Sequence, residues 1–306
     1  MAKLKSYLYR WYWASRPFSL SASIVPVLLG SSLAFSDGHW DFLLFLFVMV
    51  GSILVQVGTN LVDEYADDAR PEREEKLIAP YKVIALGLLS HRSVRLGAIC
   101  CFVVATGIGI YLTVAVGWPI LVICLVSLFV AYCYSAGPIP LGSIALGEPA
   151  VFIFMGPLMV MSTYYVHTKS INFEIFVMSI PIACMVTAIL VANDIRDVEE
   201  DRTASKRTVV TIMGRTFGRA LWILLVTTGY SIVLLQGLFS THVDHIYHSV
   251  LFLLPFLAFR RAFKAFRMIY RRDDRLGLAI GMQESAGLHL WFGLLLSLSV
   301  VGTTVL

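Results

Sequence analysis

The sequence predicts an all-α membrane protein with about nine transmembrane helices. Of its 306 residues, 58% are hydrophobic and only 14% are charged, and the mean hydropathy of +0.78 is too high for an ordinary soluble domain. Apolar stretches close to the ~20 residues that a helix needs to cross a bilayer recur along the whole chain. The alternation of apolar and polar residues that a transmembrane barrel requires is not seen.

The predicted spans follow one another with mostly short connections, so we expect one domain over 1–306. They are placed at 17–35, 42–62, 93–113, 118–136, 146–166, 173–193, 218–238, 247–264 and 284–304. The segment before the first span, "MAKLKSYLYRWYWASRP", is basic and aromatic. It lacks a small-residue cleavage site after a short apolar core, so it predicts a lead-in at the membrane interface and not a removed signal.

The basic residues indicate the orientation of the chain. They precede the first span and recur after spans two, six and eight, whereas the connections on the other side contain one basic residue, Lys169. The positive-inside rule then places the N-terminus and the long loops in the cytoplasm. Because the basic residues lie beside membrane spans, lipid headgroups account for them better than nucleic acid does, and no nucleic-acid partner is expected.

Two of the long loops, about 63–92 and 194–217, begin with the same acidic spacing. The residues are Asn60, Asp63 and Asp67 in the first and Asp194, Asp197 and Asp201 in the second. Positions i, i+3 and i+7 share one face of a helix, where like charges repel. Carboxylates are also unfavourable at a helix C-terminus. An unfavourable arrangement that occurs twice favours a bound cation that offsets it.

The residue types around these clusters favour a diphosphate site. Oxygen ligands alone are typical of Mg²⁺ or Ca²⁺, and Mg²⁺ leaves coordination positions for phosphate oxygens. Basic residues follow both clusters and suit the same phosphates. They are Arg73, Lys76 and Lys82 after the first cluster and Arg202, Lys206 and Arg207 after the second. Apolar helices around such a site would accept a hydrocarbon, so the pattern indicates an isoprenoid diphosphate.

Four stretches resemble the UbiA superfamily of intramembrane prenyltransferases, and most closely its 1,4-dihydroxy-2-naphthoate polyprenyltransferases, the MenA type. The stretches are 16–35, 134–166, 193–215 and 279–296. The most specific is the third, because the pattern N-x-x-R-D-x-x-x-D-x-x-x-x-K-R-T runs intact from Asn193 to Thr208. The resemblance implies a bundle of about nine helices around a central cavity that opens to the cytoplasmic face.

The first motif departs from the family pattern of Asn-Asp-x-x-Asp followed by Gly or Asp. Asp63 stands for the Asn, Glu64 for the next Asp and Pro71 for the last residue, while Asp67 is retained. Aspartate can bind Mg²⁺ as asparagine does, so metal binding survives these changes. The residues that can complete the oxygen ligands are Asn60, Asp63 and Asp68.

The resemblance also implies a mechanism with two Mg²⁺ ions that the diphosphate bridges. Asp63 and Asp67 would hold one ion, and Asp197 and Asp201 the other. Tyr134 would donate a hydrogen bond to the leaving group, and Arg16 would pair with the carboxylate of the acceptor or anchor the chain at the interface. The expected substrate-binding residues are Arg16, Asn60, Arg73, Lys82, Tyr134, Asn193, Asp194, Arg202, Lys206 and Arg207.

The implied function is transfer of a polyprenyl group from its diphosphate to 1,4-dihydroxy-2-naphthoate with loss of CO₂. The product would be demethylmenaquinone, made in the cell inner membrane during menaquinone biosynthesis. One alternative is a related enzyme with another acceptor, such as a hydroxybenzoate or a glycerol phosphate. The other is a transporter, but its charged residues should lie near the bilayer midplane. Here only Glu148 and Glu284 are plausible acids within spans.

Overall fold

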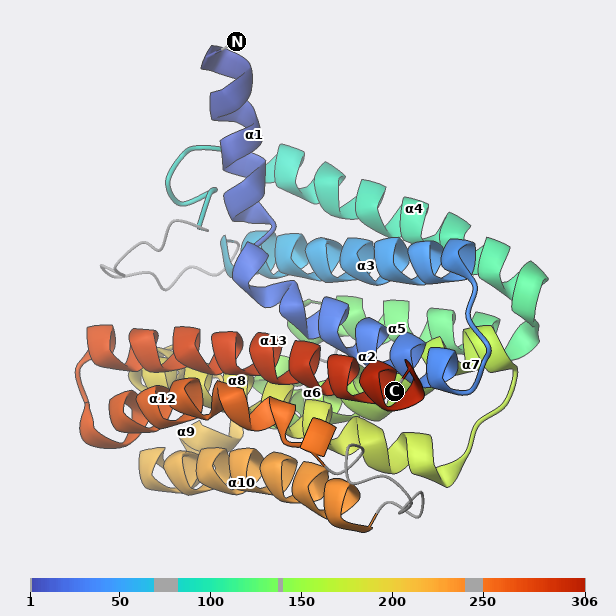
Figure 1. Cartoon of the computed structure of the whole chain (residues 1–306). Coiled ribbons are helices and arrows are strands. Elements are labelled where there is room, and N and C mark those ends of the chain that lie inside the picture. The colour runs from blue at the N-terminus through green and yellow to red at the C-terminus, as the bar shows by residue number, and fades with distance from the viewer. Residues whose placement is uncertain (1, 69–81, 137–139, 240–249, 306) are drawn as a thin grey trace. The chain divides into compact units, whose positions relative to one another are not determined.

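The computed structural model describes residues 2–68, 82–136, 140–239 and 250–305, except for the side chains of 2–6, 67, 68 and 239. Its regular structure is helical (Figure 1). The α-helices are α1 (Ala2–Ala14), α2 (Ser21–Ser36), α3 (Phe42–Asp68), α4 (His91–Val116), α5 (Trp118–Ser135), α6 (Gly147–Ile153), α7 (Met159–Thr168), α8 (Phe173–Thr203), α9 (Val209–Met213), α10 (Arg215–Phe239), α12 (Phe259–Arg271) and α13 (Arg275–Val305).

Eight segments of the described chain are long and apolar enough to cross a membrane, which confirms eight of the nine predicted spans. They are Pro17–Ser36, Phe42–Ala66, His91–Val116, Trp118–Ser135, Gly147–Thr168, Phe173–Thr203, Arg215–Leu238 and Arg275–Val305. The fifth joins α6 to α7 through a π-helical turn at Phe154–Leu158. Pro157 lies in that turn and cannot donate a backbone hydrogen bond, which is a common cause of such interruptions.

The span predicted for 247–264 is not found among the described residues. Residues 247–249 lie outside them, and Leu254–Ala258 form a 3₁₀ turn with Pro255 near its start. The following helix, α12, carries a basic residue at almost every turn and is too polar to cross a bilayer. Hydropathy averaged over this region therefore combined two different elements.

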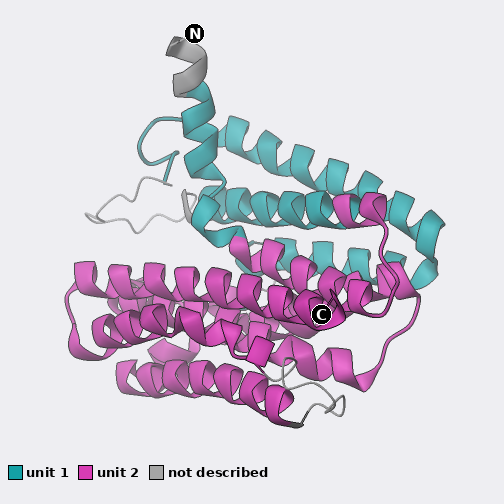
Figure 2. Ribbon diagram, in the orientation of Figure 1, with its two compact units in different colours: residues 1–20, 47–141 teal, residues 21–46, 142–306 magenta. Residues whose placement is uncertain are grey.

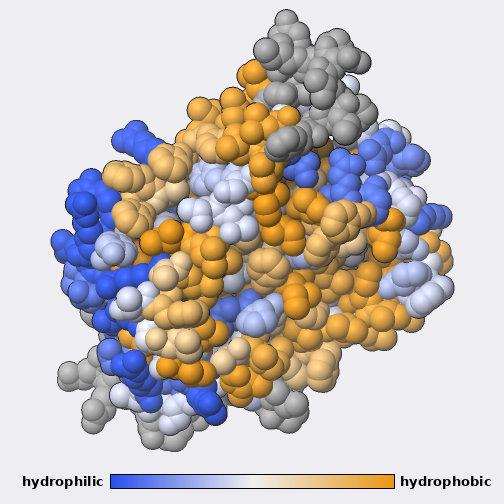
Figure 3. Space-filling model, turned by 90° about the horizontal axis from the view of Figure 1, so that it is seen from below, coloured by the Kyte–Doolittle hydropathy of each residue, from blue (hydrophilic) through white to orange (hydrophobic). Residues whose placement is uncertain are grey.

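The chain forms two compact units, and each is described by itself (Figure 2). Unit 1 contains residues 1–20 and 47–141, and unit 2 contains residues 21–46 and 142–306. On the face drawn in Figure 3, apolar side chains cover most of the middle, and hydrophilic side chains gather toward its sides. Polar ends on either side of an apolar middle are what membrane-spanning helices require.

The core of unit 1 holds the first helix against the end of α3. Ala14, Leu61, Val62 and Val94 are buried there and belong to one hydrophobic cluster. The indole of Trp11 packs so closely on α4 that a Cβ added to Gly97 would lie 2.7 Å from its ring. This packing fixes the end of α1 beside the residues of the first acidic cluster.

Helix α8 is the central element of unit 2. In the 18-residue apolar stretch of α8, 72% of the residues are buried, against 6% in the corresponding stretch of α3. Helices α10 and α13 pack along it (Figure 1), and small residues allow the closest approaches, as is typical of membrane helices. A Cβ added to Gly156 would lie 2.3 Å from the Cβ of Ala183 in α8.

We expect Gly156→Ala to destabilise the protein by about 1–3 kcal/mol, because α8 would have to move away from the added methyl group. The matched control is Gly107→Ala in α4, where an added Cβ would meet no atom within 4 Å. That change should leave stability unchanged or raise it by up to ~1 kcal/mol. Thermal unfolding of both variants in detergent tests this, and equal midpoints for Gly156→Ala and wild type would contradict the tight contact.

Candidate active site

Asp63 lies near the end of α3 and is held by groups from two other segments of unit 1. Arg16 Nη1 lies 2.5 Å from Asp63 Oδ2, and the Ser135 hydroxyl donates to Asp63 Oδ1 at 3.0 Å. Arg16 has a left-handed backbone with φ of 50°, which is uncommon for a residue other than glycine. It follows the end of α1, and its guanidinium reaches the end of α3.

Glu64 connects α3 to the chain that returns after the first loop. It is only 1% exposed, and its carboxylate accepts a hydrogen bond from the backbone N–H of Ile84 at 3.1 Å. Lys82 Nζ lies 3.6 Å from Glu64 Oε2, and Arg16 Nη2 lies 3.8 Å from the same oxygen. Lys82, a predicted phosphate ligand, is thus positioned by a buried carboxylate beside Asp63.

The other predicted residues of unit 1 differ in what the structure shows. Asn60 is buried, and its amide donates to the Ser15 carbonyl and the Ser19 hydroxyl, both at 2.8 Å. It therefore ties the chain after α1 to α3. Tyr134 is half-buried near the end of α5. Five further residues of this region are Asp67, Asp68, Pro71, Arg73 and Lys76. Asp67 and Asp68 end α3 with undescribed side chains, and the other three lie outside the described residues.

In unit 2, Arg196 organises the start of the second motif. Its guanidinium donates to both oxygens of Asp197, at 2.7 and 2.5 Å. It also donates to Asn193 Oδ1 at 2.8 Å and contacts Met282 Sδ of α13 at 3.0 Å. Two-pronged pairing of arginine with a carboxylate is strong and directional. The N-x-x-R-D pattern is thus one connected group, and the sequence alone had suggested no role for Arg196.

The end of α8 turns so that Lys206 lies over Asp201. The backbone N–H of Lys206 donates to the Asp201 carbonyl at 2.8 Å, and the ammonium lies 3.6 Å from Asp201 Oδ1. Ser205 allows this reversal by adopting φ of 54°. A buried carboxylate and a basic side chain therefore meet on the same turn.

The Lys-Arg-Thr part of the motif is fixed by its backbone. The N–H of Arg207 donates to the Ser143 carbonyl at 3.0 Å. Thr208 caps α9, because its hydroxyl accepts from Thr211 N while the Thr211 hydroxyl accepts from Thr208 N. Glu148 accepts from the N–H of Val209 at 3.0 Å. These contacts explain why a threonine follows the two basic residues.

Glu148 also reaches the second acidic cluster. It is 5% exposed, and it lies beside the side chain of Asp194, which is 4% exposed. Glu148 therefore connects α6 both to α8 and to the start of α9. Sequence reasoning had noted Glu148 only as an acid near the end of a span, since its partners lie about 50 residues away in the sequence.

Arg202 pairs with a glutamate of its own helix. Its Nη1 lies 3.4 Å from Glu199 Oε2, and both side chains are largely exposed. Glu200 on the same turn pairs with Arg275 at the start of α13. The pair of Glu200 and Arg275 connects α8 to α13, whereas the pair of Arg202 and Glu199 lies within α8. The substrate-binding role of Arg202 stays a prediction.

The donor set of both motifs suits a hard divalent cation. Among the described side chains, no three from His, Cys, Asp or Glu lie close enough to hold a metal ion. Mg²⁺ does not need three, since one or two carboxylates suffice when water and phosphate supply the remaining ligands. Asp63, Asp197 and Asp201 offer only oxygen, and each lies beside a basic group that suits a phosphate. The residues therefore fit Mg²⁺ with a diphosphate.

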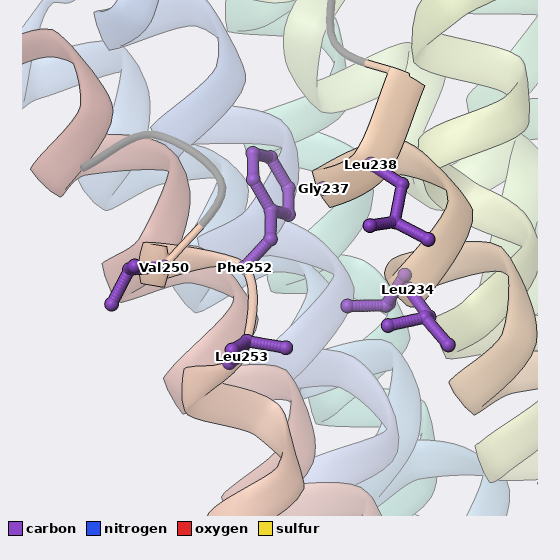
Figure 4. Close-up of a pocket in the computed structure, with 7 residues that line it drawn as sticks. Leu234, Gly237, Leu238, Val250, Phe252 and Leu253 are labelled. Carbon is purple, nitrogen blue, oxygen red and sulfur yellow. The ribbon is translucent and has the colours of Figure 1, made fainter. Parts of the chain in front are cut away.

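Two apolar pockets lie elsewhere. One of about 290 Å³ is lined by Ile99, Phe102, Val103 and Thr106 on α4. Another of about 110 Å³ lies between the end of α10 and residues 250–253 (Figure 4). Leu234, Leu238 and Leu253 are among the side chains around it, and neither pocket is lined by a charged residue. Neither can bind a diphosphate head.

The chain is similar in sequence to enzymes of known activity. It is 29% identical to the 1,4-dihydroxy-2-naphthoate octaprenyltransferase of Bacillus subtilis (strain 168), over 94% of this chain and 90% of the relative. It is 31% identical to the UbiA prenyltransferase domain-containing protein 1 homolog of Drosophila melanogaster, over 96% of this chain and 78% of the relative. It is also 26% identical to the 1,4-dihydroxy-2-naphthoate octaprenyltransferase of Escherichia coli (strain K12), over 76% of this chain and 77% of the relative.

Solved structures share the fold at low sequence identity. A UbiA homolog from Archaeoglobus fulgidus bound to GPP and Mg²⁺ aligns with a TM-score of 0.64 and 13% identity, over 96% of this chain and 99% of its own. A UbiA homolog from Aeropyrum pernix K1 gives a TM-score of 0.65 and 11% identity, over 92% and 97%. The model of the UbiA prenyltransferase family matches residues 23–283. The chain therefore belongs to the UbiA prenyltransferase family and is an integral membrane prenyltransferase.

Proposed function

We propose that the enzyme transfers a polyprenyl group from its diphosphate to 1,4-dihydroxy-2-naphthoate, with loss of CO₂, to give demethylmenaquinone. The observation that carries this proposal is the intact second motif, from Asn193 to Thr208, in a chain that aligns along 94% of its length with a 1,4-dihydroxy-2-naphthoate octaprenyltransferase. Three further relatives named 1,4-dihydroxy-2-naphthoate octaprenyltransferase, from Escherichia coli, Haemophilus influenzae and Mycobacterium tuberculosis, support the acceptor.

The proposed donor site uses the acidic groups of both units. Asp63 and Asp67 would hold one Mg²⁺, and Asp197 and Asp201 a second, with the diphosphate between them. When bound, Mg²⁺ would neutralise the negative charge that develops on the diphosphate as the allylic C–O bond breaks. A solved UbiA homolog that binds GPP and Mg²⁺ supports this choice of ligands.

The basic residues of the motifs would orient the diphosphate. Lys206 and Lys82 each lie beside a motif carboxylate, so a phosphate oxygen that enters there would meet an ammonium already in place. Arg207, with its backbone fixed to Ser143, would supply a further contact. Arg73, Arg202 and Tyr134 complete the proposed set, with Tyr134 donating to the leaving group. An apolar surrounding would exclude water from the electrophilic prenyl carbon.

Arg16 of unit 1 and Arg196 of unit 2 are both paired with a motif aspartate. Each is an arginine in contact with one motif aspartate, which supports a role in orienting that aspartate. Asn193 and Asp194 would assist through their contacts with Arg196 and Glu148. The pairing of Arg16 with the carboxylate of the acceptor stays a prediction, since it requires Arg16 to leave Asp63.

We further propose that the two units act together as one domain in the cell inner membrane, around a cavity open to the cytoplasm. The family match covers parts of both units. The excess of basic residues in the loops that carry the motifs supports a cytoplasmic N-terminus.

We expect membranes that contain the enzyme to prenylate 1,4-dihydroxy-2-naphthoate and to release one CO₂ per prenyl group transferred. The experiment supplies a prenyl diphosphate with a panel of acceptors that includes a hydroxybenzoate and a glycerol phosphate, and analyses the lipid extract by mass spectrometry. Membranes without the enzyme are the control. Prenylation of another acceptor alone, or a product that keeps the carboxyl group, would contradict the proposal.

We expect Asp197→Asn to lower the rate of prenyl transfer by about a hundredfold or more, because it removes charge at the proposed metal and leaves the side-chain shape unchanged. Glu199→Gln is the matched control, since Glu199 lies on the same helix but is 68% exposed. It should keep nearly full activity. Full activity of folded Asp197→Asn would show that Asp197 has no part in the reaction.

We expect EDTA to stop prenyl transfer and added Mg²⁺ to restore it, because two acidic clusters and a diphosphate repel each other without a divalent cation. The measurement is initial rate in purified, metal-stripped enzyme as Mg²⁺ is added back. Turnover that continues unchanged in EDTA would exclude the proposed metal dependence.

A further inference from the structure

Helix α12 has three distinct faces. Ala262, Ala265 and Ile269 are buried against the rest of unit 2. The opposite side is basic. Its residues, Arg260, Lys264, Arg267 and Arg271, recur at i, i+4, i+7 and i+11 and are all exposed, a spacing that keeps them on one side of a helix. Aromatic side chains form a third face between the other two.

The aromatic face is exposed and lies next to the basic one. Phe259, Phe263 and Tyr270 are 56%, 54% and 55% exposed, and the ring of Phe266 stacks on Tyr270 with centroids 5.3 Å apart. Exposed aromatics beside a basic face are typical of helices that lie at a membrane interface, where the rings contact acyl chains and the charges contact headgroups.

The carboxylates around α12 pair with basic residues outside its basic face, except that Glu284 also pairs with Lys264 of that face. Glu284 of α13 pairs with Arg261 at 3.0 Å and with Lys264 at 2.6 Å. Asp273 pairs with Arg219 at 2.7 Å. Hydrogen bonds from Arg272 and from the backbone of Gly277 lower the pKa of Asp274 to about 2, so it stays charged and paired. Within the described parts of the chain, no carboxylate pairs with Arg260, Arg267 or Arg271.

Helix α12 packs along the first part of α13. Ile269 packs against Gly281 of α13, and Arg261 packs against Gly287, so α12 runs antiparallel to α13. The turn that follows α12 leads to Arg275, which pairs with Glu200 of the second motif. The basic face is therefore at the same end of unit 2 as that motif (Figure 1).

We propose that the basic face of α12 binds anionic phospholipid headgroups, with Phe259, Phe263 and Tyr270 in contact with their acyl chains. Negative headgroups complement three arginines that no described carboxylate neutralises. The basic face extends over eleven residue steps of helix, or about 16 Å, which is too long for one diphosphate. Such a site would hold the second motif at a fixed depth in an anionic leaflet.

The test measures how much phosphatidylglycerol the purified full-length protein retains in native mass spectrometry, with phosphatidylcholine as the neutral competitor. Arg260→Gln combined with Arg267→Gln should lower retention of phosphatidylglycerol roughly fivefold for each arginine removed, as expected for a basic residue at an anionic surface. The matched control, Arg92→Gln with Arg95→Gln on exposed positions of α4, removes the same charge and should change retention much less.

Two further measurements do not depend on the folding of the glutamine variant. Arg260→Lys with Arg267→Lys keeps the charge and should retain the lipid as wild type does. In the wild type, a tenfold rise in ionic strength, which shortens the Debye length about threefold, should release phosphatidylglycerol before phosphatidylcholine. Equal retention of the two lipids, insensitivity to salt, or an equal loss in the control on α4 would each overturn the proposal.

Discussion

Carboxylates at the end of an apolar helix lie at the negative end of its dipole and close to hydrocarbon, so each needs a nearby positive charge. The structure meets this need for four of the described motif carboxylates, whereas Asp194 is buried beside the carboxyl group of Glu148. Asp63 pairs with Arg16, Glu64 with Lys82, Asp197 with Arg196 and Asp201 with Lys206. The basic partners come from the end of α1, from the return of the first loop and from the motif itself, and they determine where those segments lie.

These ion pairs and hydrogen bonds give a physical reason for the residue types of the second motif. Arg196 links Asn193 to Asp197, Lys206 returns over Asp201, and Thr208 caps the next helix. Asp197, Asp201, Lys206 and Arg207 are the residues of this motif that we propose to bind the metal and the diphosphate directly. Asn193, Arg196 and Thr208 instead hold those groups in place. Their presence in the motif is therefore explained by the geometry of the site.

Much of the fold could be predicted from the sequence because a bilayer permits few alternatives. Backbone groups in hydrocarbon must bond within their own helix, so hydropathy and length located eight spans. The exception was the span predicted for 247–264. There, Pro255 and the basic residues of α12 interrupt the apolar segment. The spacing of the aspartates likewise indicated which residues share a face. It did not indicate that Arg16 and Glu148 join them, because these residues lie 47 and 46 positions away from Asp63 and Asp194 and only tertiary packing brings them near.

The backbone contacts between Asp201 and Val209 make the length of this segment as important as its composition. Lys206 is hydrogen-bonded to Asp201, Arg207 to Ser143 and Val209 to Glu148, so three residues within four positions are fixed to different helices. One inserted or deleted residue would displace the ammonium, the guanidinium and the cap together, whatever its side chain. A change in the length of the segment between Asp201 and Thr208 should therefore be tolerated less well than a substitution within it.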